Sequence, residues 1–147
     1  MKRCLTILSD SLDKKIEVLK RIQAYNDAQE KAFTESEPDM DSFDTALDEK
    51  EKLIQEILQL DQGFETLYER VKAELDENRD AYRDQIKELQ EKITVITELS
   101  NAVQAKEARN KKLVENYFAN QRMGIKQSRQ RARAAYGYQQ SMLNKDH

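Results

Sequence analysis

The sequence predicts an all-α protein, an elongated antiparallel three-helix bundle or coiled coil with a basic amphipathic extension at its C-terminus. Two observations lead to this prediction. Apolar residues recur at steps of three and four from residue 41 to residue 121, which places them on one face of a helix, and this stretch contains no proline and one glycine. Charged residues make up 36% of the chain and tryptophan is absent, which is typical of a narrow bundle with solvated outer faces.

The first helix is expected over residues 3–35. Its apolar stripe ends shortly before the only proline of the chain. Pro38 has no N–H to donate and restricts Glu37 to extended geometry, so a helix cannot continue through this position. The stripe of this helix consists of Leu5, Leu8, Leu12, Ile16, Leu19, Ile22, Tyr25 and Phe33.

The second helix is expected over residues 42–77. Asp41 or Ser42 can accept hydrogen bonds from the free N–H groups of its first turn. Its apolar face must be covered by other helices. That face consists of Phe43, Leu47, Leu53 or Ile54, Ile57, Leu60, Phe64, Leu67 or Tyr68, Val71 and Leu75.

A reversal between the second and third helices is expected near residues 76–80, so that the third helix covers residues 80–121. The segment carries no apolar residue, and Asn78 and Asp80 can cap helix ends. The alternative is one uninterrupted helix of about 120 Å, which the absence of glycine and proline here favours. We favour the reversal, because helices of similar length can bury one another's stripes.

Polar residues interrupt the apolar stripe of the third helix at Ser100, Glu107 and Asn110. A polar seam can set the register of a coiled coil at a cost in stability. The same residues can instead mark the place where the third helix outruns its neighbours and becomes solvated. Of these two interpretations we favour the solvated one.

Charge divides the chain into two parts. Residues 1–108 hold 16 Lys/Arg and 26 Asp/Glu, a balance of −10, whereas residues 109–147 hold nine and two, a balance of +7. Such a split is typical of an interaction tail, or of a basic end that packs against an acidic body. We therefore divide the chain into a helical bundle, residues 1–121, and a basic C-terminal tail, residues 122–147, that is partly helical or disordered.

Residue types that carry catalysis or bind metals are sparse. The only histidine is His147, the last residue, and the only cysteine, Cys4, has no CxxC partner. The three glycines are isolated, so no glycine-rich loop can cradle a phosphate. Acidic pairs such as Asp44 and Asp48 fit solvated helix faces. We expect no enzyme activity, no cofactor and no metal site.

The sequence also predicts a cytoplasmic protein without stable membrane insertion. No apolar run approaches the roughly 20 residues of a membrane span. Asp10 and Asp13 interrupt any secretion signal at the N-terminus. A single cysteine gives no reason to expect an oxidising compartment.

The tail carries a basic stripe, Arg122, Lys126, Arg129 and Arg133, beside a thinner apolar face. Nucleic acid would use the cations on phosphates and stack on tyrosines, but the acidic body would repel it. A membrane surface would need bulkier apolar residues than the alanines present. A partner helix needs only a moderately apolar surface with Met and Tyr. We therefore favour a protein partner over a solvated terminal helix that only keeps the protein soluble.

The chain resembles the flagellar export chaperones of the FlgN type, which are small cytoplasmic all-helical proteins. The resemblance covers nearly the whole chain. It lies in the first helix with IEVLKRIQAYNDAQEKAF, in the second with FDTALDEKEKLIQEILQLDQGFETLYERV, and in the tail NYFANQRMGIKQSRQRARAAYGYQQSM, which is the most distinctive portion.

The resemblance implies a chaperone that binds late export substrates, the hook-associated proteins that join hook to filament, and delivers them to the export apparatus. It also implies that the C-terminal part contacts the substrate, where Arg129 and Arg133 would steer an acidic partner. The expected partner-binding residues are Tyr117, Phe118, Ile125, Arg129, Ala132, Arg133, Tyr136, Tyr138, Met142 and Leu143.

Two other functions stay open at this point. One is a generic coiled-coil adaptor or oligomerisation module, and the other is a nucleic-acid-associated protein whose binding would collapse as salt rises. Monomer and homodimer are both open, and so is the identity of the substrate.

Overall fold

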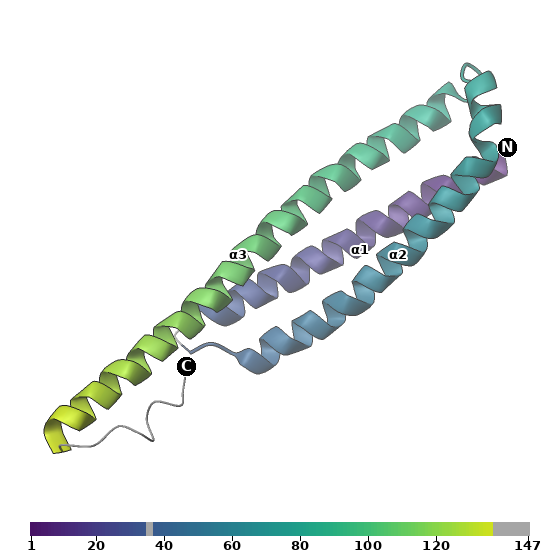
Figure 1. Ribbon diagram of the computed structural model, residues 1–147. Helices are drawn as coiled ribbons and strands as arrows, with labels where there is room; N and C mark the ends of the chain where they lie inside the picture. The colour runs from purple at the N-terminus through teal and green to yellow at the C-terminus, as the bar shows by residue number, and fades with distance from the viewer. Residues whose placement is uncertain (35–36, 137–147) are drawn as a thin grey trace.

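The computed structural model describes residues 1–34 and 37–136, with side chains described as far as residue 123. It contains the helices α1 (Lys2–Thr34), α2 (Met40–Glu77) and α3 (Arg83–Tyr136), and no strand among these residues. Figure 1 shows that α2 runs antiparallel to α1 and α3. The prediction of an all-α three-helix bundle is therefore confirmed.

The residue that caps the start of α2, after the break that follows α1, is one that the sequence interpretation missed. Asp39 is the N-cap of α2: its side chain accepts a hydrogen bond from the backbone N–H of Ser42 at 3.0 Å and one from the Ser42 hydroxyl at 2.6 Å. These bonds hold the pKa of Asp39 below its ordinary value. The expected caps, Asp41 and Ser42, lie inside the helix instead, because the chain turns helical directly after Pro38 and Asp39.

The turn between α2 and α3 forms without glycine or proline. Asn78 ends α2: its backbone N–H donates to the carbonyls of Glu74 and Leu75, and its side-chain amide donates to the Glu74 carbonyl at 2.8 Å. One asparagine thus satisfies carbonyls that would otherwise lack partners at the helix end. Two separate helices follow, rather than one helix of about 120 Å.

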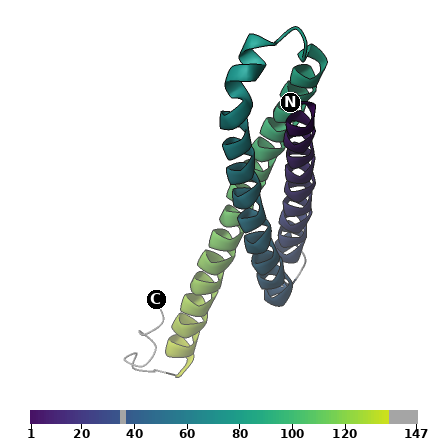
Figure 2. The ribbon, with the colours of Figure 1, turned by 90° about the vertical axis from the view of Figure 1, so that its right-hand side faces the viewer.

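The helix α1 lies at the centre of the packing, because it packs against both α2 and α3, whereas the described residues show no comparable packing of α2 against α3. Figure 2 shows the three helices from the side. Most of the buried apolar residues lie on α1 as far as residue 22 and on the parts of α2 and α3 in the same half of the bundle. They are Leu5, Leu8, Leu12, Val18, Leu19, Ile22, Leu53, Val71, Leu75, Leu89 and Ile96.

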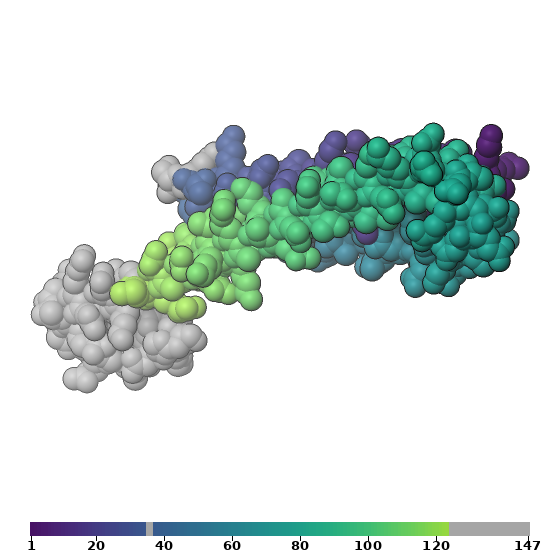
Figure 3. Space-filling model, turned by 90° about the horizontal axis from the view of Figure 1, so that it is seen from above, coloured from purple at the N-terminus to yellow at the C-terminus, as the bar shows by residue number. Residues whose placement is uncertain are grey.

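The helix α3 has 54 residues, against 33 in α1 and 38 in α2, and its C-terminal end projects beyond the other two helices (Figure 3). It continues through residue 121 without interruption, so no helix end marks the proposed division of the chain there. That division stays a prediction. No helix among the described residues is long and apolar enough to cross a membrane.

Candidate partner-binding site

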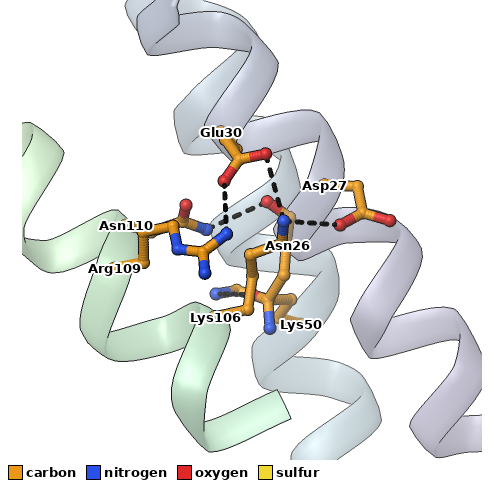
Figure 4. Close-up of polar contacts among 7 residues, drawn as sticks. All are labelled: Asn26, Asp27, Glu30, Lys50, Lys106, Arg109 and Asn110. Atoms are coloured by element: carbon orange, nitrogen blue, oxygen red, sulfur yellow. Dashed lines mark hydrogen bonds and ion pairs between the residues drawn. The ribbon is translucent and has the colours of Figure 1, made fainter. Parts of the chain in front are cut away.

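A buried polar cluster ties all three helices together near the C-terminal end of α1 (Figure 4). The ammonium of Lys50, on α2, donates to Asn26 Oδ1 of α1 at 2.8 Å and to Glu107 of α3 at 2.7 Å. Asn110 of α3 donates its side-chain amide to the backbone carbonyl of Asn26 at 2.9 Å. Lys50 is only 3% exposed, so these hydrogen bonds offset the cost of burying its charge.

The structure corrects our interpretation of the polar positions on α3. We expected Glu107 and Asn110 to mark a solvated stretch beyond the bundle. Asn110 is instead 4% exposed and bonded to α1, and Glu107 pairs with the buried Lys50. These residues form a seam between helices, which suits a role in setting register. The helix α3 therefore leaves the bundle further along the chain than we expected, beyond Asn110.

Ion pairs at the edge of this cluster hold α3 against α1. The Lys106 ammonium lies 3.0 Å from Glu30 and 3.3 Å from Asp27, and Arg109 lies 3.6 Å from Glu30. The hydrogen bond from Lys106 holds the pKa of Glu30 below its ordinary value, and the same bond raises the pKa of Lys106. The pair therefore stays charged over a wider range of pH than the two groups would alone.

Aromatic rings make the last contacts among the three helices. Phe33 of α1 meets Phe43 of α2 with 5.0 Å between ring centroids and Tyr117 of α3 with 5.5 Å, both in edge-to-face geometry. Tyr117 in turn contacts Phe118 at 5.3 Å. Edge-to-face pairs contribute about 0.5–1.5 kcal/mol each beyond the area they bury. This aromatic junction, consisting of Phe33, Phe43, Tyr117 and Phe118, fixes the point at which α3 leaves the bundle.

Large apolar side chains are exposed on α3 at this point. Phe118 is 42% exposed and Met123 is 60% exposed. The Phe118 ring contacts the ring of its chain neighbour Tyr117, and the rest of it is open to a partner. The aromatic junction and the start of the projecting helix together form the candidate site.

Two of the predicted site residues, Tyr117 and Phe118, have side chains in the described part of the structure, and the fold places Phe33 of α1 against Tyr117. Met123 was missed, and so were Phe33 and Phe43, although their position on either side of the proline break indicated that they would meet at one end of the bundle. The backbone of a second group is helical in α3, and its side chains lie outside the described part: Ile125, Arg129, Ala132, Arg133 and Tyr136. The remaining three lie outside the described residues: Tyr138, Met142 and Leu143.

Comparison with protein-family models shows that the family described as FlgN protein matches residues 1–143, nearly the whole chain. No curated protein and no solved structure matches the chain.

Proposed function

Since this chain belongs to the FlgN family of flagellar export chaperones, we propose that it binds hook-associated proteins in the cytoplasm and delivers them to the export apparatus. The family is one of chaperones rather than of enzymes, and its members bind flagellar proteins. To this family function the proposal adds three things: the class of substrate, the place on the chain where it binds, and the way the two helices contact each other.

The observation that carries the proposal is the exposure of Phe118 and Met123 where α3 leaves the bundle. An amphipathic helix of the substrate can lay its apolar face along this part of α3. Such helix-to-helix recognition uses anchors three, four or seven residues apart. In the sequence Phe118 and Ile125 have this spacing, whereas Met123, five residues after Phe118, lies on another side of α3 and would contact the edge of a bound segment. The aromatic junction supports the start of this surface, because Phe33 of α1 contacts Tyr117 and is itself packed against Phe43 of α2.

The binding mode is suited to a substrate that must later be released. A segment that is disordered before binding loses conformational entropy when it orders, and this offsets part of the gain from apolar contact. The basic residues Arg129 and Arg133 would steer an acidic substrate segment and accelerate its association. Affinity would depend chiefly on the apolar anchors, so it would weaken only modestly with salt.

The test is a pull-down from the cytoplasm of the source organism with the full-length protein, followed by mass spectrometry. The double variant Phe118→Ala with Met123→Ala should lose the hook-associated proteins that the native chain captures. Leu58→Ala with Val95→Ala is the matched control, because both residues are exposed apolar side chains away from the aromatic junction. Equal capture by the native chain and the Phe118/Met123 variant would refute this site. Capture of no flagellar protein by the native chain would refute the proposed substrate class.

A further inference from the structure

The helix α2 carries most of the negative charge of the bundle. It holds 12 Asp/Glu and four Lys/Arg, a balance of −8, whereas the balance is +2 for α1 and +6 for α3. Figure 1 shows α1 between α2 and α3, so one side of α2 packs on α1 and the rest of its surface faces solvent. A partner that approaches α2 from solvent therefore meets an acidic helix.

Three large aliphatic side chains are exposed on this acidic helix. Leu47 is 40% exposed, Ile54 is 45% exposed and Leu58 is 56% exposed, and none of them belongs to the packed apolar clusters of the described residues. Steps of seven and four place them in one stripe along α2, which is about 16 Å long at 1.5 Å per residue. The solvent side of a bundle helix is ordinarily polar, so this aliphatic stripe is a surface without a partner in the chain.

Unpaired carboxylates lie beside the aliphatic stripe. Asp44 precedes Leu47 by three residues and Glu51 follows it by four, so both acids are its neighbours on the surface of the helix. Both are exposed, and neither forms an ion pair within the described part of the chain. Asp61, further along, is already paired with Lys15 of α1 at 2.6 Å. The free negative charge therefore lies beside the first half of the stripe.

The four basic residues of α2 do not neutralise this surface. Lys50 is buried in the polar cluster, and Lys52 pairs with a glutamate one turn back. Arg70 and Lys72 come 12 and 14 residues after Leu58, which is about 18 Å and about 21 Å along the helix. The stripe thus combines apolar side chains with negative charge that α2 itself leaves uncompensated.

This combination selects the chemistry of a partner. Nucleic acid and an anionic membrane surface would bring phosphates toward carboxylates, and the stripe of a second copy would bring acids against acids. A helix with aliphatic residues on one face and Lys or Arg along its border has neither problem. Its apolar face would cover the stripe, as in other helix-to-helix contacts, while its cations pair with the acids.

We propose that α2 is a second interaction surface of this protein, which takes a basic amphipathic helix of a partner protein against Leu47, Ile54 and Leu58. The aliphatic stripe supplies affinity, whereas Asp44 and Glu51 set the orientation of the partner helix and accelerate its association. The end of α3 has the opposite charge and suits an acidic segment. The two surfaces therefore differ both in their helix and in the charge of the partner that they require.

The probe is a fluorescently labelled synthetic helix of about 18 residues, about 27 Å long and so longer than the stripe. It carries leucines on one face and lysines along both borders. A second peptide has the same composition with the positions shuffled, so it has the same charge but no apolar face. Each peptide is titrated with the full-length protein and followed by fluorescence anisotropy. The amphipathic peptide should bind at least about tenfold more tightly than the shuffled one.

Two double variants test the two parts of the surface. Ile54→Ser with Leu58→Ser removes aliphatic side chains from the stripe, and Asp44→Lys with Glu51→Lys reverses the charge beside it. Each double variant should raise the dissociation constant of the amphipathic peptide about tenfold or more. Because all four side chains are exposed, the melting temperature should change little.

Each double variant has a matched control elsewhere on the bundle. Ile7→Ser with Val95→Ser removes exposed apolar side chains from α1 and α3, and Glu56→Lys with Glu74→Lys makes the same change of net charge on another side of α2. Neither control should change the dissociation constant by more than about twofold. The charge control separates a specific site from the general attraction between a basic peptide and an acidic helix.

Loss of peptide binding in both test variants, with native-like binding in both controls, would assign the surface. Equal binding of the two peptides, or equal loss in test and control variants, would overturn it, because charge alone would then attract the peptide. Failure of the amphipathic peptide to bind would overturn it too. A dimer seen by light scattering and abolished by Ile54→Ser with Leu58→Ser would assign the stripe to a second copy, against the proposal.

The same variants keep this surface distinct from the site in the proposed function. Phe118→Ala with Met123→Ala should leave peptide binding unchanged, and Leu58→Ala with Val95→Ala should leave the capture of hook-associated proteins unchanged. Peptide binding that depended on Phe118 and Met123 would place the peptide at the end of α3 and overturn the α2 surface. Either proposal can therefore fail while the other holds.

Discussion

The two halves of the bundle are held together by different chemistry. In the half that contains the start of α1, aliphatic side chains such as Leu5, Leu8 and Leu12 are nearly fully buried. In the half that contains the end of α1, the buried positions include four polar residues, and ion pairs and aromatic rings lie beside them. These polar residues are Asn26, Gln29, Lys50 and Asn110, and the apolar residues buried with them, Ala32 and Ala46, are small.

The difference indicates a division of tasks along one bundle. Apolar burial is roughly proportional to area and has little directional preference, so the aliphatic half can supply most of the stability. Hydrogen bonds and ion pairs require specific geometry, so the polar half can fix how the helices align. It also holds α3 firmly just before this helix leaves the bundle. Four predictions test this comparison, from the largest expected effect to the smallest.

The aliphatic half should respond most to truncation. Leu8 is fully buried, so Leu8→Ala should lower the free energy of unfolding by about 2–5 kcal/mol through lost burial and the cavity left behind. The neighbouring Ile7 is 51% exposed, and Ile7→Ala should change the free energy by less than about 1 kcal/mol. Urea denaturation measures both. Equal effects of the two variants would contradict the placement of the core.

The polar half should show the same contrast between neighbouring lysines. Lys50→Ala removes the donor to Asn26 and Glu107 and should destabilise the fold by about 1–3 kcal/mol, because a buried acceptor is left without its partner. Lys52→Ala is the control, since the Lys52 side chain is 73% exposed and should contribute almost nothing. If Lys50→Ala melts like the control, the polar seam does not hold the helices.

The aromatic junction should affect the end of α3 more than the whole fold. Phe33→Leu keeps an apolar side chain but loses the edge-to-face pairs with Phe43 and Tyr117, a loss of about 0.5–1.5 kcal/mol for each pair. Hydrogen exchange should accelerate around Tyr117, while exchange near Leu89 in the aliphatic half should change little. Uniform acceleration along α3 would contradict a local role.

The smallest effect is a pH dependence at Glu30. Because folding lowers the pKa of this carboxyl through the hydrogen bond from Lys106, its contribution to stability is present above the pKa of the unfolded chain. The contribution is lost as pH falls through the folded value. The difference in melting temperature between the native chain and Glu30→Gln should therefore be largest near pH 7 and should shrink as pH falls from about 5 to about 3. A constant difference would show that Glu30 acts without its charge.

Much of the fold could be predicted from local chemistry. The apolar spacing indicated helices, Pro38 indicated the first break, and the capping potential of Asn78 indicated the second. Each of these signals depends on residues close together in the chain, so no knowledge of the tertiary structure was needed. The interpretation failed at Asp39, because several capping residues stand side by side there and only the observed geometry selects one.

The candidate site was less accessible to prediction. Tyr117 and Phe118 were identified through a family resemblance, whereas Phe33, Phe43 and Met123 were missed. The polar seam was misinterpreted because Asn110 and Glu107 look like solvated residues until their partners are known. Asn26 and Lys50 are far from them in the chain.

Helix periodicity, proline chemistry and capping were thus enough to specify the number of helices, their order and most of the apolar residues they bury. Leu47, on the expected face of α2, is nevertheless 40% exposed, and Val18, outside the expected stripe of α1, is buried. The tertiary structure decided that Lys50 would be buried against Asn26 and Glu107 and that Phe33 would contact Tyr117. It also decided that α2 and α3 would each pack along α1 and not along each other. These features depend on the rotation and axial offset of whole helices. A shift of one residue along a helix turns each side chain by about 100°, so only the combined packing of three helices selects the partners of each residue.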